Sequence, residues 1–228
     1  MRTLGIIALG VVLLIGVGVV WWHVNYPTYG YRYRLTLAIE TGGKVHTGSS
    51  VIEIIWSGGP EIGDVGPYHP RIRGQAALVD LGSSGAILAA LINGESYGPA
   101  ADGALGALWI VPRAFGTNSA LEHLPSLPHL TGQRKLTPDN MLRLIWFADI
   151  SDPKTARKIL PGEIPQLLGP HSRLVDSYIE ITRDPLVIDI DKKIPWFKPW
   201  ADRYRQEGPI RLPNGTVLSR YMFLGDAS

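Results

Sequence analysis

Residues 32–56 read RYRLTLAIETGGKVHTGSSVIEIIW, and this stretch decides the fold that we expect for the chain. From Arg32 to Glu40, apolar and polar side chains alternate, which is typical of a strand with one buried face. Gly42-Gly43 can adopt the positive φ of a tight hairpin turn. The segment from Val45 to Trp56 then returns as a second strand, with a bulge expected at Gly48. The sequence therefore predicts a long β-hairpin.

Four polar side chains of the second strand form a candidate site around the expected bulge. They are His46, Ser49, Ser50 and Glu53. A bulge can re-aim side chains towards one another, so His46 and Glu53 could act as an acid–base pair. Simple alternation instead places His46 with Ser50 on one face and Ser49 with Glu53 on the other. A solvent-facing strand explains the same residues, and this interpretation is the stronger one.

On the N-terminal side of the hairpin, residues 4–22 read LGIIALGVVLLIGVGVVWW. A helix of roughly 19 residues spans about 28 Å, close to the ~30 Å of a bilayer hydrocarbon core. Trp21 and Trp22 suit headgroup depth at one end, and Arg2 lies at the other. A cleaved signal peptide is the main alternative, but the run lacks a small-residue cleavage site. We therefore predict a membrane anchor over residues 1–22, inserted through residues 4–22.

Flanking charge gives the expected orientation of this anchor. Arg2 is adjacent to the apolar run, whereas Arg32 and Arg34 lie about ten residues beyond its other end. The positive-inside rule then favours a cytoplasmic N-terminus and an exported domain. We expect a single-pass protein of the inner (plasma) membrane, with its domain in the periplasm of a bacterial envelope.

Composition limits the class of the remaining chain. The protein has 228 residues, a net charge of +2 and no cysteine, with 26 glycines and 18 prolines spread along it. This charge does not indicate nucleic-acid binding, and frequent Gly and Pro favour short strands and turns over a helical bundle. We predict a stalk over residues 23–31 and one β-rich globular domain over residues 32–228, so that the whole is α+β, mostly β, with a few short helices.

Local patterns predict the other elements of this domain. We expect strands over residues 75–81, 86–92, 107–111, 141–147 and 173–182, and a hairpin about Asn214-Gly215. Helices are expected from Ser151-Asp152-Pro153 to about Leu160 and over residues 164–168, the second ending at Gly169-Pro170.

Three short segments carry a resemblance to a known group of proteins. Arg32-Tyr33-Arg34-Leu35-Thr36, Gly48-Ser49-Ser50-Val51-Ile52-Glu53 and Asp152-Pro153-Lys154 follow the apolar run in this order. In that order the chain resembles uncharacterised bacterial membrane-anchored proteins. The resemblance implies no function and no site residue.

Catalytic and metal motifs are weak. Ser151 and Lys154 match the S-x-x-K spacing in which a lysine could deprotonate a serine, but the companion S-D-N and K-T-G elements are missing. Ser151 is better explained as a helix cap. His123 with His129, and Asp189 with Asp191, lack the further ligands of a metal site. We therefore expect no metal and no cofactor.

The strongest binding signal is an aromatic segment near the C-terminus. Trp196, Phe197 and Trp200 lie between prolines and near Lys193 and Lys198. They could dock on a protein partner or a bilayer, since Trp is frequent in both interfaces. They could instead complete the core of the domain, and this interpretation is the stronger one.

These observations together favour a membrane-anchored binding, accessory or assembly protein of the cell envelope with a protein partner. The alternative is an envelope hydrolase that uses Ser151, Lys154 and His46. The sequence leans towards a protein that is not an enzyme.

Overall fold

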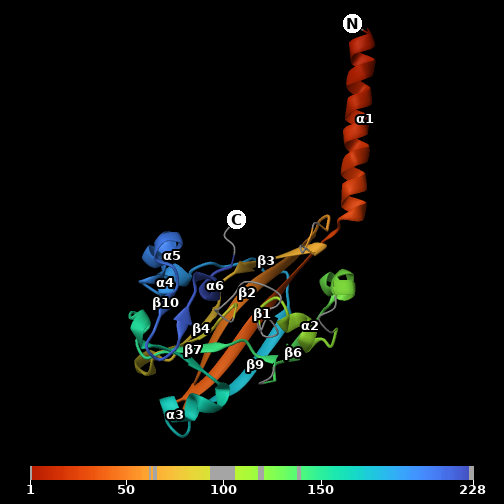
Figure 1. Cartoon of the computed structure of the whole chain (residues 1–228). Helices are drawn as coiled ribbons and strands as arrows, with labels where there is room; N and C mark the ends of the chain where they lie inside the picture. The colour runs from red at the N-terminus through yellow and green to blue at the C-terminus, as the bar shows by residue number, and fades with distance from the viewer. Residues whose placement is uncertain are drawn as a thin grey trace.

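The protein was analysed as a computed structural model that describes residues 2–61, 63, 66–92, 106–117, 121–137 and 140–225, with residues 2–9 described by their backbone alone. The fold is α+β, mostly β, as the sequence predicts. In the described part of the chain, two larger antiparallel sheets, one two-stranded sheet and a few short helices form the domain, and one long helix precedes it (Figure 1).

Helix α1 (Arg2–Asn25) extends away from the domain (Figure 1). All residues from Gly10 to Asn25 are exposed. Among the residues whose side chains are described, no helix is both long and apolar enough to cross a membrane. The segment expected as a stalk, residues 23–31, divides between the end of α1 and the start of the first strand, so that Tyr26 and Pro27 alone separate helix from sheet.

The predicted hairpin is confirmed and is longer than expected. Strands β1 (Thr28–Thr41) and β2 (Lys44–Gly58) pair without interruption from Thr28 opposite Ser57 to Thr41 opposite Lys44. Gly42 and Gly43 make the turn with φ of 57° and 74°. Both values lie in the left-handed region that glycine adopts at little cost, which explains the Gly-Gly pair.

The hairpin forms the centre of a five-stranded sheet with the order β3-β2-β1-β9-β6. The added strands are β3 (Tyr68–Gly74), β9 (Arg173–Ile181) and β6 (Gln133–Lys135). One face of the sheet is apolar and buried, because Tyr33, Leu35, Leu37 and Ile39 alternate towards the core. The expected strand over residues 173–182 is thus confirmed as β9.

A second sheet has the order β4-β5-β7-β8. Its strands are β4 (Ala77–Asp80), β5 (Ala86–Ala89), β7 (Leu144–Phe147) and β8 (Ala156–Ile159). The 3-10 turn η1 (Gly82–Ser84) joins β4 to β5. Every residue of β5 is buried. The predicted strands over residues 75–81, 86–92 and 141–147 are therefore present, although each is shorter than expected.

The C-terminal segment packs on this second sheet. It contains α4 (Ile190–Lys193), α5 (Phe197–Glu207), β10 (Ile210–Arg211), β11 (Val217–Leu218) and α6 (Arg220–Phe223). Phe223 of α6 packs on Phe147 of β7, with ring centroids 6.3 Å apart. The expected hairpin about Asn214-Gly215 is confirmed as the β10–β11 pair.

The remaining short elements lie between the strands. They are α2 (Ile110–Ala114), the 3-10 helix η3 (Leu121–His129), the 3-10 turns η5 (Pro153–Thr155) and η6 (Pro161–Glu163), and α3 (Ile164–Leu168). Helix α3 and its end at Gly169 are as predicted. Buried Tyr31 and Tyr33 donate hydrogen bonds to the carbonyls of Leu108 and Ala107, at 3.4 and 3.0 Å, and so fix the chain before α2 to the central sheet.

Two predicted elements are wrong. The strand expected over residues 107–111 is a turn that leads into α2. Its carbonyls accept hydrogen bonds from the tyrosine hydroxyls of β1, and it has no neighbouring strand among the described residues. The helix expected from Ser151 to Leu160 is only the turn η5, followed by β8. Pairing of residues 156–159 with the open edge of β7 outweighs the local helix signal.

The bulge expected at Gly48 is also wrong, since Gly48 pairs directly with Leu37 in an unbroken register. Glycine is needed there for a different reason. A Cβ atom at this position would lie 2.1 Å from the carbonyl oxygen of Leu78 in β4. The two sheets therefore approach each other with backbone against backbone at Gly48.

This contact gives a stability prediction. Gly48→Ala is expected to lower the free energy of unfolding by about 1–3 kcal/mol, because one sheet must move to admit the methyl group. Gly162→Ala is the control, since a Cβ there meets nothing within 4 Å. Chemical denaturation of the detergent-solubilised chain, followed by circular dichroism, measures both. Equal stability of the two variants would show that the sheets do not meet at Gly48.

Candidate functional site

The three aromatic residues predicted to bind a partner lie in the interior of the C-terminal segment. Phe197 and Trp200 are 2% and 6% exposed. Half-buried Trp196 donates its indole N–H to the carbonyl of Ile150 at 2.9 Å and packs edge-on against Phe223 at 5.5 Å. This packing supports the interpretation that these residues complete the core, which the sequence analysis had also considered.

Helix α5 explains why these residues turn inward. Phe197 and Trp200 are three residues apart, so they project from one side of the helix. Their neighbours Lys198 and Asp202 form an exposed ion pair on the other side, at 3.3 Å. The amphipathic pattern of α5 therefore fixes its buried face, and the prolines of the segment only begin the helix.

The residues of the alternative hydrolase do not come together. Ser151 and Lys154 are both exposed, and it is the side chain of Asp152 that accepts the backbone N–H of Lys154, at 2.9 Å. His46 lies across the second sheet, where its Nδ1 is 2.9 Å from the carbonyl oxygen of Asp80. Asp80 and Ala156 are at the same end of the sheet but three strand spacings apart. That separation is about 14 Å, so His46 is not placed to act on Ser151.

His46 and Glu53 do not form the acid–base pair considered from the sequence. Both lie on β2, and their positions are separated by about 23 Å along the strand. Glu53 instead accepts hydrogen bonds from Arg32 Nε at 2.7 Å and Arg73 Nη1 at 2.9 Å. These three residues are opposite one another on β1, β2 and β3. The structure therefore uses Glu53 to join three strands.

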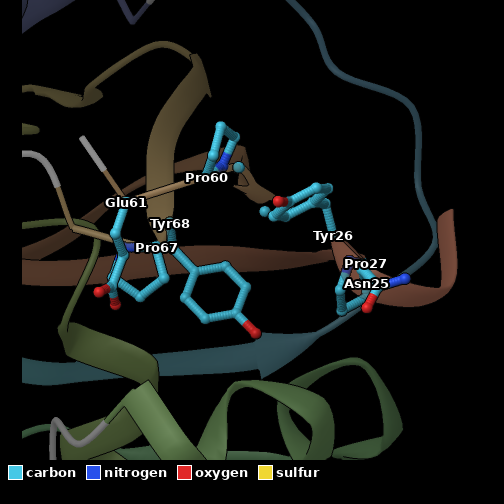
Figure 2. Close-up of a pocket in the computed structure, with 9 residues that line it drawn as sticks. Asn25, Tyr26, Pro27, Pro60, Glu61, Pro67 and Tyr68 are labelled. Atoms are coloured by element: carbon cyan, nitrogen blue, oxygen red, sulfur yellow. The ribbon is translucent and has the colours of Figure 1, made fainter. Parts of the chain in front are cut away.

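A cleft is present where α1 meets the five-stranded sheet, with a volume of about 340 Å³. It is lined by Asn25, Tyr26, Pro27, Gly58, Gly59, Pro60, Glu61, Pro67 and Tyr68. Figure 2 shows Tyr26 and Tyr68 on opposite sides of the hollow, with Pro60 and Pro67 beside them. The end of the helix and the β2–β3 connection thus build the cleft together.

Backbone hydrogen bonds hold the walls of this cleft. Gly58 N–H donates to the carbonyl of Pro27 at 2.9 Å, and Gly59 N–H donates to that of Pro67 at 3.0 Å. A Cβ on Gly58 would lie 2.7 Å from the carbonyl oxygen of Pro27. Glycine at position 58 is therefore required for the connection to fold back against the end of α1.

Aromatic contacts continue from the helix into the cleft. Trp22 packs against Tyr26 with ring centroids 4.6 Å apart, and Tyr29 packs against Tyr68 at 6.0 Å. Burial raises the pKa of the Tyr68 phenol above its ordinary value of 10.0, and neighbouring Tyr29 adds to the rise. Tyr68 is therefore neutral at physiological pH and presents a π face and an uncharged hydroxyl.

Sequence reasoning missed Glu61 and Tyr68, because residues 57–70 have the composition of a simple loop. The available signal was Gly58-Gly59 directly after an apolar strand, which indicates close backbone approach. The partner in that approach, Pro27, lies far earlier in the chain and is revealed only by the register of β1 with β2.

Among the described residues, no group of three or more His, Asp or Glu side chains is placed to hold a metal ion. Comparison of the chain with known protein families, with curated proteins and with solved structures gives no match. The geometry of the chain itself is therefore the guide to its site.

The burial of the aromatic segment leads to a direct prediction. Phe197→Ala is expected to lower the free energy of unfolding by about 3–5 kcal/mol, because it leaves a cavity among Trp196, Trp200 and Phe223. Val187→Ala is the control, since Val187 is 58% exposed and should change stability by no more than about 0.5 kcal/mol. A small effect of Phe197→Ala in denaturant unfolding would indicate that this residue lies at the surface.

Proposed function

We propose that the chain is a membrane-anchored protein of the cell envelope whose domain acts by binding, as an accessory or assembly component. The observation that carries the proposal is the uncovered surface of α1. Consecutive large apolar residues of this helix are exposed, including Val12, Leu14 and Val17, so that no side of it is polar over the described residues 10–22. A helix that is apolar all round requires an apolar environment.

The length of the helix agrees with an anchor. Its 24 residues span about 36 Å as a helix, and the apolar run of the sequence, residues 4–22, accounts for about 28 Å. Trp21, Trp22 and Tyr26 follow at the end nearest the domain. Aromatic side chains of this kind are favoured at the boundary between hydrocarbon and headgroups.

The connection to the domain supports a role at the membrane surface. Only Tyr26 and Pro27 separate α1 from β1, and Gly58 of β2 is hydrogen-bonded to Pro27. The end of α1 is thus held next to the central hairpin, with two residues between them. An anchored domain of this kind stays next to the bilayer, where it would meet membrane or envelope partners.

Binding is preferred to hydrolysis because the structure separates the residues that a hydrolase would need. Ser151 and Lys154 lie in an exposed turn before β8, whereas His46 lies on β2 of the other sheet and contacts the Asp80 carbonyl of β4. For this reason the hydrolase remains the lesser proposal.

Orientation can be tested because the chain contains no cysteine. In intact cells, a membrane-impermeant maleimide is expected to label Asp202→Cys, whose side chain is 64% exposed, but to label Thr3→Cys only after lysis. Labelling of Thr3→Cys alone would reverse the proposed topology. Labelling of neither position without lysis would place the whole chain inside the cell.

The accessory role has its own test. Full-length protein purified from its native membranes in mild detergent is expected to carry a second protein in a fixed ratio. The control is the Gly162→Ala variant, which leaves every described contact in place. A pure monomer or homo-oligomer would contradict the accessory role while leaving the anchor unaffected.

A further inference from the structure

If α1 is an anchor, the cleft at its end lies at a defined depth in the bilayer. The ligand that we infer for the cleft therefore rests on the proposed function. Asn25 and Tyr26 line the cleft and directly follow the Trp21-Trp22 pair. With Trp21 and Trp22 at the boundary of the hydrocarbon, the cleft lies among the lipid headgroups. Headgroups are therefore the molecules at highest local concentration around it.

The lining residues select the kind of headgroup. Of the described residues that line the cleft, Glu61 alone belongs to a charged residue type, and it is exposed. The other walls are the rings of Tyr26, Tyr68, Pro60 and Pro67 (Figure 2). Aromatic faces with a nearby carboxylate attract an ammonium group, because the ring quadrupole and the carboxylate both favour positive charge.

The same lining disfavours a phosphate. No lysine or arginine is among the described residues that line the cleft, and Glu61 repels an anion. The backbone N–H groups of Gly58 and Gly59, which could otherwise form an anion-binding nest, already donate to Pro27 and Pro67. An anionic headgroup therefore finds no positive charge among the described lining residues, and the N–H groups of these two glycines are already engaged.

The cleft is also preformed and of suitable size. Its walls are held by the two glycine hydrogen bonds and by the Trp22–Tyr26 and Tyr29–Tyr68 ring contacts. A volume of about 340 Å³ is at the lower end of the range of about 300–1,000 Å³ that is typical of small-molecule sites. Little ordering is then needed when a small cation enters.

We propose that this cleft binds the ammonium group of a zwitterionic phospholipid headgroup, such as that of phosphatidylethanolamine, with Glu61 as its counter-charge and Tyr26 and Tyr68 as its aromatic walls. Such a contact fixes the orientation of the domain on the bilayer. It also makes the membrane around α1 richer in this lipid.

Native mass spectrometry of the full-length protein tests the assignment. The protein is placed in detergent micelles that contain equal amounts of phosphatidylethanolamine and phosphatidylglycerol with identical acyl chains. Wild-type protein is expected to retain the ethanolamine lipid in excess by about fivefold, and Glu61→Gln is expected to remove this excess. Glu122→Gln, at a side chain that is 78% exposed on η3, serves as the matched control and should behave as wild type.

Two tyrosine variants separate a cation–π contact from simple apolar packing. Tyr26→Phe keeps the aromatic face and is expected to keep the preference, whereas Tyr26→Leu is expected to lose most of it. Equal retention of the two lipids by wild type, or an unchanged preference in Glu61→Gln, overturns the proposal. Displacement of the lipid by an equal concentration of free ethanolamine overturns the lipid as the source of the ammonium group.

Failure of the ammonium site is distinguishable from failure of the anchor. Alkaline extraction of cell membranes that contain the protein reports insertion of α1 and does not depend on headgroup type. Protein that resists extraction but shows no lipid preference contradicts only the ammonium site. Protein that is released into the supernatant contradicts the proposed function itself.

Discussion

The pairing of β1 with β2 is the interaction on which the rest of the structure depends. Its register runs unbroken from Thr28–Ser57 to Thr41–Lys44, so that one pairing determines the contacts made at both ends of the long hairpin. Near the turn it places Gly48 against the carbonyl of Leu78 and brings the two sheets into contact. At the other end it places Gly58 against Pro27, which attaches α1 to the sheet and closes one side of the cleft. A slip of one residue would exchange the two faces of the strand and remove both contacts.

Those elements that depend on neighbouring residues could be predicted from the sequence. Gly42-Gly43, the alternation from Tyr33 to Ile39 and the Asn214-Gly215 turn each specify their structure within a few residues. Elements that depend on a distant partner could not. Residues 156–159 carry a weak helix signal and become a strand because β7 offers them an open edge. Residues 107–109 are apolar enough for a strand, but the carbonyls of Ala107 and Leu108 accept hydrogen bonds from the hydroxyls of Tyr33 and Tyr31 instead.

The same distinction applies to the candidate sites. The dense group of aromatic residues around Trp196 suggests a binding surface, although three-residue spacing on an amphipathic helix buries Phe197 and Trp200 together. The cleft contains less conspicuous residues, two tyrosines and one glutamate from segments far apart in the chain. Its chemistry arises from position, because the hairpin register places these residues directly beside the end of an apolar helix. The strand pairing therefore places the cleft beside the end of α1, and the ligand proposed for the cleft depends on this adjacency.

The depth of α1 in a bilayer is the most direct measurement of the proposed anchor. Single cysteines introduced one at a time from Val11 to Asn25 can each carry a nitroxide, since the chain has no other thiol. After reconstitution in lipid, accessibility to a water-soluble nickel reagent is expected to stay low from Val11 to Val20 and to rise through Trp22 to Asn25. It should show no helical period of about 3.6 residues, because lipid would surround the helix on all sides. High accessibility near Leu14, or a helical period with one wet face, would contradict an anchor and with it the placement of the cleft at the membrane surface.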